Sequence, residues 1–249
     1  MSIDDHGFLS KDLAHVQNHI RNHYAKYFDV IHRVNTFCQR VKYRLSVYSL
    51  DGREIIAACV MIKILNDMQA AILLIERGMA SQARTLIRTG LEALFILANI
   101  CRVEGFWRSF ILSDQLARLR LLRAIRDHPS ALLEDVRPYV TPELIDRLNQ
   151  EIREQGITEE KVEHLARRVH LQSLYDGAYR LFSQDVHTSP RALETYAAFD
   201  QDTNLVGFVC WPQADDLEAE LTVIPRILIL AFAVVNELFG LKLDQGLQP

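Results

Sequence analysis

The fold of this chain is decided by residues 54–102, which read EIIAACVMIKILNDMQAAILLIERGMASQARTLIRTGLEALFILANICR. Two long apolar segments are separated there by Gly78, a residue that permits a turn. We therefore predict one helix from about Glu54 to Arg77 and a second from about Ser81 to Arg102. Helices this long and this apolar are typical of the centre of a domain, so the two are expected to form a central hairpin.

Apolar residues recur at helical spacing on both sides of this hairpin. Two helices are predicted in the N-terminal region 1–50, at about 11–27 and 30–48. Further helices are predicted within 104–187, at about 104–128, 142–155 and 158–169, followed by one that ends near residue 187. Residues 188–216 lose this periodicity and are predicted to be irregular, with a short strand pair around Leu205 to Trp211. A buried helix at about 217–241 is expected to close the fold, within a C-terminal region 217–243.

The sequence therefore predicts an all-α, single-domain bundle of eight or nine helices that covers residues 1–249. A hydrophobic fraction of 49% with 24% charged residues supports a sizeable core. The formal net charge of −4 argues against a broad basic surface for indiscriminate duplex binding, although it leaves room for a local basic patch.

Two observations predict a cytoplasmic protein without membrane insertion. The uninterrupted apolar run at residues 227–235 is too short for a bilayer, which needs about 20 residues, and the N-terminus is acidic and polar, unlike a secretory signal. The four cysteines form no CxxC pair and mostly sit among apolar neighbours, so they are expected to be reduced core residues: Cys38, Cys59, Cys101 and Cys210.

One polar pattern lies on the second helix of the hairpin. Arg84, Arg88 and Glu92 are each four residues apart and share one face of an otherwise apolar helix. If the turn is centred near Met79, the antiparallel partner helix brings Asp67 level with Glu92. Burying charges is costly unless they pair. The pattern therefore predicts a partly buried charged cluster, which serves either to fix helix register or as a functional polar site.

A second polar pattern lies near residue 180. On a regular helix with about 100° of rotation per residue, five polar side chains fall on one narrow arc: Asp176, Tyr179, Arg180, Ser183 and His187. The opposite arc is apolar and includes Leu181 and Val186. A solvated helix face explains such an arc equally well. Asp185 falls inside the apolar arc, so its carboxylate is expected to snorkel to water, to pair with a cation such as an arginine of the hairpin, or to lie at a subunit contact.

Other candidate sites are weaker. His15, His19 and His23 are four apart on one predicted helix, a spacing that is compatible with zinc, although solvated histidines are the simpler explanation and no metal is predicted. Four arginines form a basic strip that is compatible with phosphate contacts: Arg118, Arg120, Arg123 and Arg126. The sequence has no glycine-rich phosphate loop, HExxH or GxSxG motif, which argues against those enzyme classes.

The spacing from Arg180 to His187 in a helical chain resembles the signature of the HEPN superfamily, an arginine followed after four to six residues by a histidine. The wider pattern of Arg88-x-x-x-Glu92 followed by Tyr179-x-x-x-Ser183-x-x-x-His187 also resembles an uncharacterised family of bacterial helical proteins. The sequence departs from the HEPN pattern at Leu181, because a polar residue commonly follows the arginine in the nucleases of that superfamily.

The HEPN resemblance implies a metal-independent ribonuclease or RNA-binding protein without a cofactor, whose site forms where two protomers of a homodimer meet. His187 would transfer a proton, Arg180 would stabilise negative charge on the phosphate, and Tyr179, Ser183, Arg88 and Glu92 would support them. By analogy, such a protein acts as a toxin or phage-defence effector. Two alternatives remain open: a non-enzymatic interaction or regulatory protein whose polar residues are structural, and a metal-dependent enzyme that uses the N-terminal histidines.

Overall fold

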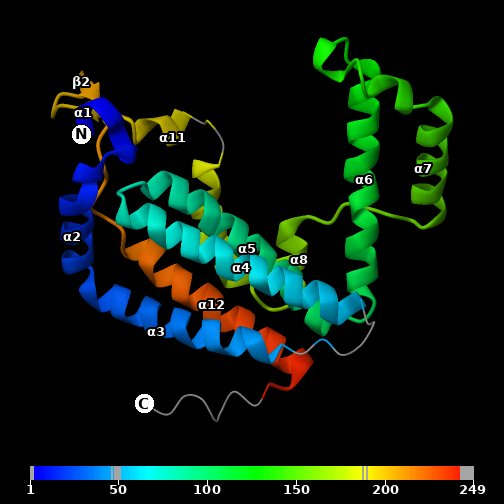
Figure 1. Ribbon diagram of the computed structural model, residues 1–249, viewed down its shortest axis with the longest axis horizontal. Helices are drawn as coiled ribbons and strands as arrows, with labels where there is room; N and C mark the ends of the chain where they lie inside the picture. The colour runs from blue at the N-terminus through cyan, green and yellow to red at the C-terminus, as the bar shows by residue number, and fades with distance from the viewer. Residues whose placement is uncertain (1–2, 46, 48–51, 187, 189, 242–249) are drawn as a thin grey trace.

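The hairpin predicted from residues 54–102 is the centre of the structure (Figure 1). In the computed structural model, which describes residues 3–45, 47, 52–186, 188 and 190–241, α4 (Gly52–Glu76) and α5 (Ala80–Arg102) pack antiparallel. The C-terminal helix α12 (Glu218–Phe239) lies against both of them and against α3 (Ala25–Val41). These four helices provide most of the main hydrophobic core, which confirms the all-α prediction.

The turn between α4 and α5 depends on Gly78. Its φ of +73° lies in the left-handed region that glycine adopts without strain. A Cβ at this position would also lie 2.5 Å from Cβ of Pro212, and the Gly78 carbonyl accepts a hydrogen bond from the Gln213 backbone N–H. The turn is therefore both tight and covered by the segment that leads into α12.

Most of the remaining elements agree with the sequence prediction. Among the described residues, eight helices have at least seven residues: α2 (Ala14–His23), α3, α4, α5, α6 (Phe106–Asp127), α7 (Pro142–Glu154), α8 (Val162–Arg168) and α12. A strand pair is present, formed by β1 (Ala197–Phe199) and β2 (Leu205–Phe208), which pair antiparallel, but only β2 falls in the predicted range of Leu205 to Trp211. Short elements complete the chain: α1 (Ile3–His6), η1 (Gly7–Leu9), η2 (Lys11–Leu13), η3 (Lys42–Arg44), η4 (Ala131–Leu133), η5 (Arg137–Tyr139) and α11 (Pro190–Glu194).

The helix predicted to end near residue 187 differs from the expectation of one regular helix. It consists of α9 (Gln172–Leu174), a π-helical turn η6 (Tyr175–Tyr179), α10 (Arg180–Phe182) and a 3₁₀ turn η7 (Ser183–Asp185). The Arg180 backbone N–H donates to the Tyr175 carbonyl, five residues earlier. A π turn holds one residue more than an α turn, so angles counted across it at 100° per residue are wrong.

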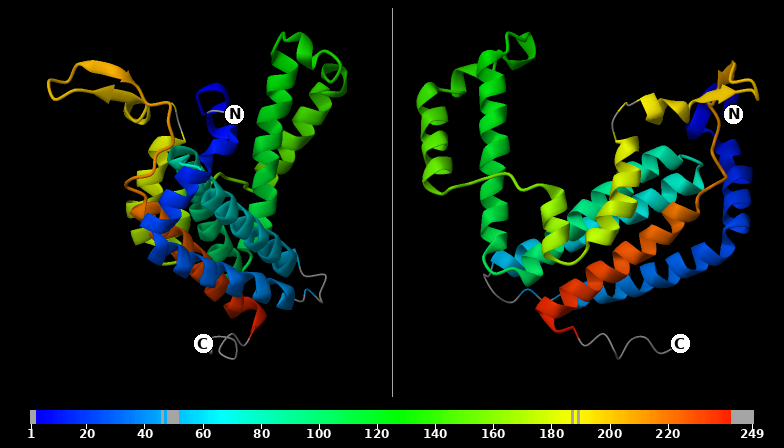
Figure 2. Two further views of the ribbon diagram at one scale, coloured as in Figure 1. Left: turned by 60° about the vertical axis from the view of Figure 1, so that its left-hand side comes forward. Right: turned by 180° about the vertical axis from the view of Figure 1, so that it is seen from behind.

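Two parts of the chain stand away from the central helices (Figure 2). One is formed by α6 and α7, which we call the arm. Its outer part has a small hydrophobic core of its own, formed by Leu119, Val140, Ile145 and Leu148. The other is the β1–β2 hairpin, where Phe199, Val206 and Phe208 are exposed.

Two further findings concern the two most apolar helices and the cysteines. Helices α4 and α12 are both long and apolar enough to cross a membrane by length and composition alone, and 39% and 50% of their most apolar windows are buried inside the protein. Core helices of soluble proteins share these properties. Among the cysteines, Cys38 and Cys101 are buried as expected, whereas Cys59 and Cys210 are exposed, so the expectation of core residues is wrong for these two.

Candidate functional site

The polar face of α5 supplies one side of the candidate site. Arg88 and Glu92 are one turn apart, and the Arg88 Nη1 lies 2.9 Å from the Glu92 Oε2. Their side chains are 25% and 33% exposed, so neither points into open solvent. The predicted ion pair is therefore confirmed as a partly buried one.

Asp67 does not join this cluster, contrary to the prediction. Its carboxylate pairs with Lys63 on its own helix at 2.5 Å. A Cβ added to Gly90 would lie 2.4 Å from Cε of Met68, which shows that Met68 is the residue of α4 that faces α5 at this level. Because neighbouring residues on a helix point about 100° apart, Asp67 is turned away from Glu92.

Tyr179 connects α5 to the π turn. Its hydroxyl accepts a hydrogen bond from Arg88 Nη2 at 2.5 Å and donates a longer one to Glu92 Oε2 at 3.4 Å. The Arg88 guanidinium also lies 4.8 Å from the centre of the Tyr179 ring, within cation–π distance. Arg88, Glu92 and Tyr179 thus form one connected group, which we call the Arg88 cluster.

Tyr179 is buried, with 7% of its surface exposed, which corrects its expected place on a solvent-facing arc. The ring packs against Phe95 and stacks on Tyr175 with a centroid distance of 5.0 Å. Burial raises the pKa of the Tyr179 phenol, the nearby Glu92 carboxylate raises it further, and Arg88 opposes both. The phenol therefore stays protonated and keeps its donor role near neutral pH.

The wide turn also explains why Leu181 is on the outside. Leu181 was expected on the apolar arc, but 51% of its surface is exposed. The extra residue of the π turn changes the angular position of every residue after it. Gly177 lies in the middle of this turn, and glycine weakens a regular α-helix by about 1 kcal/mol relative to alanine, which favours the distortion here.

Arg180 follows the π turn directly and lies at the surface. Its side chain is 60% exposed, and its Nε is 3.7 Å from the Asp176 carboxylate, which is too far for a hydrogen bond. The guanidinium lies 5.4 Å from the centre of the Tyr175 ring. The ring and the carboxylate orient the guanidinium, while its N–H groups make no hydrogen bond to the described residues.

Ser183, another residue of the predicted motif, is less available to a ligand than Arg180. The Ser183 hydroxyl donates to the Tyr179 carbonyl at 2.6 Å, four residues earlier, so its proton is already used. His187 lies outside the described residues. Tyr179 and Arg180 flank one peptide bond, but Tyr179 points into the core and Arg180 points outward.

A second cluster lies one turn earlier on α5, around Arg84. The Arg84 guanidinium pairs with Glu220 of α12 and lies 3.8 Å from Asp185 of η7. Of the three environments expected for Asp185, the structure shows the one beside an arginine of the hairpin. Glu220 is fully buried, and its second oxygen, Oε2, makes no hydrogen bond in the structure. We call these three residues the Arg84 cluster.

The other candidates of the sequence do not form a site of the expected kind. His19 and His23 stack with a centroid distance of 6.0 Å, and His15 Nδ1 lies near the Asp12 carbonyl. Within the described ranges, no three His, Cys, Asp or Glu side chains are placed to hold a metal ion. On α6 the basic strip is largely paired, since Arg120 contacts Glu159, Arg123 contacts Asn149 and Arg126 contacts Asp127.

The comparison of the sequence with protein families gives one match. Residues 54–204 match the model of a family of unknown function, DUF5677. The chain belongs to the DUF5677 family. No curated protein and no solved structure was found to match it.

The DUF5677 match extends from α4 through the β1–β2 turn and so includes both halves of the Arg88 cluster, together with Arg180 and His187. It ends before α12, which supplies Glu220 of the Arg84 cluster. Sequence reasoning missed Tyr175 and Glu220. Only Gly177 signals the π turn that places Tyr175 beside Arg180, and no local pattern links Glu220 to Arg84, which is 136 residues away.

Proposed function

We propose that this DUF5677 protein binds RNA at the surface around Arg180 and cleaves it without a metal ion, in the manner of HEPN proteins. The observation that carries the proposal is the exposed Arg180 guanidinium, oriented by Tyr175 and Asp176 and without a hydrogen bond to the described residues. An arginine presented in this way is suited to a phosphate group, two oxygens of which accept charge-assisted hydrogen bonds from the guanidinium.

The residues behind Arg180 support this role by their rigidity. Tyr175 stacks on Tyr179, and Tyr179 is fixed to α5 by its contact with Arg88. A chain of contacts thus leads from the exposed guanidinium to the central hairpin. A cationic group held on a rigid support loses little conformational entropy when it binds an anion, which favours binding of a phosphate at this position.

The chemistry proposed for the cleavage step needs a group that transfers a proton. In the HEPN resemblance this group is His187, which removes the proton of the ribose 2′-hydroxyl or returns one to the leaving oxygen. Arg180 would stabilise the charge that develops on the phosphate. A second copy of the chain is part of the proposal, because the resemblance implies a site between two protomers.

The test measures RNA binding and RNA cleavage in the presence of a chelator. A fluorescein-labelled single-stranded RNA oligomer reports binding by anisotropy, and gel electrophoresis reports cleavage. Replacing Arg180 by alanine is expected to weaken binding about tenfold and to lower the slope of log K against log salt by about 1, as for the loss of one phosphate contact. His187→Ala is expected to abolish cleavage while binding remains.

Arg33→Ala is the matched control. Arg33 is exposed and lies 3.9 Å from Asp29, an acidic residue four positions earlier, just as Arg180 has Asp176 four positions earlier. Unlike Arg180, it has no cation–π contact with an aromatic ring of the described residues. Its loss removes the same charge from the protein. Equal weakening by both variants would mean that RNA responds only to net charge, and the proposed site would then be wrong. Size-exclusion chromatography with light scattering measures the molar mass and so tests whether the protein is a dimer.

The closed geometry of the Arg88 cluster favours a second candidate, a non-enzymatic interaction or regulatory protein. Arg88, Glu92 and Tyr179 contact one another and join the π turn to α5, as a purely structural group would, although the buried Arg88 Nε makes no hydrogen bond to the described residues. The same assays separate the two functions. If the wild-type protein neither binds nor cleaves RNA, the nuclease proposal fails and the interaction protein is the better hypothesis.

A further inference from the structure

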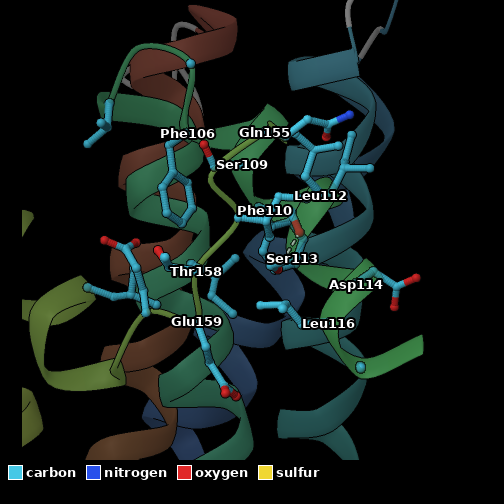
Figure 3. Close-up of a pocket in the computed structure, with 18 of the residues that line it drawn as sticks. Phe106, Ser109, Phe110, Leu112, Ser113, Asp114, Leu116, Gln155, Thr158 and Glu159 are labelled. Atoms are coloured by element: carbon cyan, nitrogen blue, oxygen red, sulfur yellow. Dashed lines mark hydrogen bonds between the residues drawn. The ribbon is translucent and has the colours of Figure 1, made fainter. Parts of the chain in front are cut away.

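A cleft of about 1020 Å³ lies between the inner part of the arm and the central helices. One wall is formed by α6, from Phe106 to Arg120, and the other by α5, α8 and the connection at residues 155–162. Figure 3 shows side chains of α6, among them Phe106, Phe110 and Leu116, together with Thr158 and Glu159 of that connection. At about 1.5 Å per residue, the wall along α6 is about 20 Å long.

The floor of this cleft is apolar. Phe106 and Phe110 stack at a centroid distance of 6.4 Å, and Ile96 of α5 and Leu165 of α8 line the cleft from the other wall. Ile111 also lines it and is 48% exposed. An apolar floor that stays in contact with water favours an occupant that brings apolar side chains of its own.

The charges that line the cleft are mostly negative. Two arginines, Arg120 and Arg168, face five carboxylates: Glu92, Glu104, Asp114, Glu159 and Glu160. Arg120 pairs with Glu159 and Arg168 with Glu160, while Arg88 of the neighbouring cluster pairs with Glu92. Glu104 and Asp114 are both exposed, and neither has an ion pair with another described residue.

The excess of negative charge excludes a polyanion as the natural occupant and favours a cation. RNA would meet two unpaired carboxylates here and would find both arginines already bound to glutamates. A basic partner, by contrast, would gain from Glu104 and Asp114 without breaking an existing pair. The cleft is therefore a different surface from the one around Arg180.

We propose that this cleft binds an amphipathic, positively charged helix of a partner protein. The apolar side of that helix would lie on the floor, and its lysine or arginine side chains would lie beside Glu104 and Asp114. A wall of about 20 Å matches a helix of about 14 residues. Apolar anchors with charged flanks are the usual way in which a helix binds in a groove.

The test uses three labelled peptides of about 14 residues that share one helical pattern. The first carries leucine on one face and lysine on the other. The second replaces lysine by glutamate, and the third replaces leucine by serine. Fluorescence anisotropy with the full-length protein is expected to show binding of the leucine–lysine peptide, with affinity at least about tenfold higher than that of either of the others.

Variants of exposed residues locate the binding site without endangering the fold. Glu104→Gln/Asp114→Asn is expected to weaken binding of the leucine–lysine peptide about threefold to tenfold. Glu134→Gln/Asp135→Asn is its control, because both residues are exposed on the arm away from the cleft and the loss of charge is the same.

The apolar part of the contact is tested by Ile111→Ser, with Leu121→Ser as its control. Both residues are exposed on α6, at 48% and 60%, but only Ile111 lines the cleft. The first variant is expected to weaken binding about threefold to tenfold and the second to leave it unchanged. Equal effects of a variant and its control would overturn the proposal.

Two further results would also overturn it. One is equal binding of the leucine–glutamate peptide, which would mean that apolar contact alone is responsible. The other is displacement of the bound peptide by a single-stranded RNA oligomer, with RNA binding that increases in Glu104→Gln/Asp114→Asn, which would assign the cleft to nucleic acid. Arg180→Ala should leave peptide binding unchanged, so this proposal and the proposed ribonuclease function can fail separately.

Discussion

Arg84 and Arg88 are one helical turn apart on α5, yet they lie in regions of opposite character. Arg84 is enclosed by α12 and η7 and contacts two carboxylates, one of them fully buried. Arg88 contacts one carboxylate that is 33% exposed, Glu92, and the hydroxyl of Tyr179. The Arg88 cluster is linked to the exposed Arg180 through the stack of Tyr179 on Tyr175, whereas the Arg84 cluster lines a separate pocket of about 400 Å³ beside α11 and α12. Because its carboxylates are more deeply buried, the Arg84 cluster is expected to contribute more to the stability of the fold, whereas the Arg88 cluster lies behind the surface that we propose binds RNA.

The largest expected effect is that of Arg84→Met. It leaves the buried Glu220 carboxylate without its cation, and removing one partner of a buried ion pair costs about 3–5 kcal/mol. Urea unfolding measures this loss. In Arg84→Met/Glu220→Gln the uncompensated charge is gone, so stability should return in large part. If the single variant lost less than about 1 kcal/mol of unfolding free energy, the Arg84 cluster would be no more important for stability than the Arg88 cluster.

Tyr179→Phe is expected to have an intermediate effect. The change keeps the ring in the core but removes the hydroxyl that joins Arg88 to Glu92, and hydrogen bonds to charged groups contribute about 1.5–3 kcal/mol. Urea unfolding is again the measurement, and RNA binding by the folded variant shows whether the support of Arg180 depends on this hydroxyl. Tyr43→Phe is the control, since Tyr43 is 81% exposed.

Arg88→Met should cost less than either change, about 1 kcal/mol. The Glu92 side chain is already 33% exposed beside Arg88, so water can solvate the carboxylate when the arginine is removed. The unfolding free energies of Arg84→Met and Arg88→Met, measured side by side, compare the same substitution in the two regions. Equal losses would show that the Arg88 cluster is as structural as the Arg84 cluster.

The smallest expected effect is a dependence on pH. Burial raises the pKa of Tyr179 in the folded protein, whereas an unfolded tyrosine ionises near its ordinary pKa of about 10. Above that pH the unfolded chain releases a proton that the folded chain retains, so the unfolding free energy falls as pH rises. Phenylalanine does not titrate. The stability difference between wild type and Tyr179→Phe should therefore shrink by about 0.5–1 kcal/mol between about pH 8.5 and 10.5, and a constant difference would contradict the assigned burial.

The sequence predicts those parts of the structure that depend on local rules. The α4–α5 hairpin follows from two apolar segments around Gly78, and the Arg88–Glu92 pair follows from a spacing of four on a regular helix. For Asp185, an arginine of the hairpin was one of three expected environments, because a carboxylate on an apolar arc needs a cation, water or a subunit contact.

The parts that the sequence does not predict depend on contacts between distant segments or on a departure from regular geometry. Glu220 meets Arg84 only because α12 packs on α5, and nothing near Glu220 in the sequence indicates that. Asp67 was misplaced because the rotation of α4 about its axis is set by packing, here by Met68 against Gly90. Tyr179 was misplaced because the π turn breaks the assumed rotation per residue.

The π turn has a consequence for how relatives of this chain should be aligned. An α-helix becomes a π turn when it accommodates one inserted residue without a loop. A relative that lacks this insertion would be one residue shorter between Leu174 and Arg180, yet it would present the arginine on the same side of the helix. In such a relative, the residues equivalent to Tyr175 and Arg180 would be one position closer in sequence than here, although they would occupy the same places in space. An alignment that forbids gaps inside this helix would pair the wrong residues, and a motif defined by spacing alone would miss such relatives.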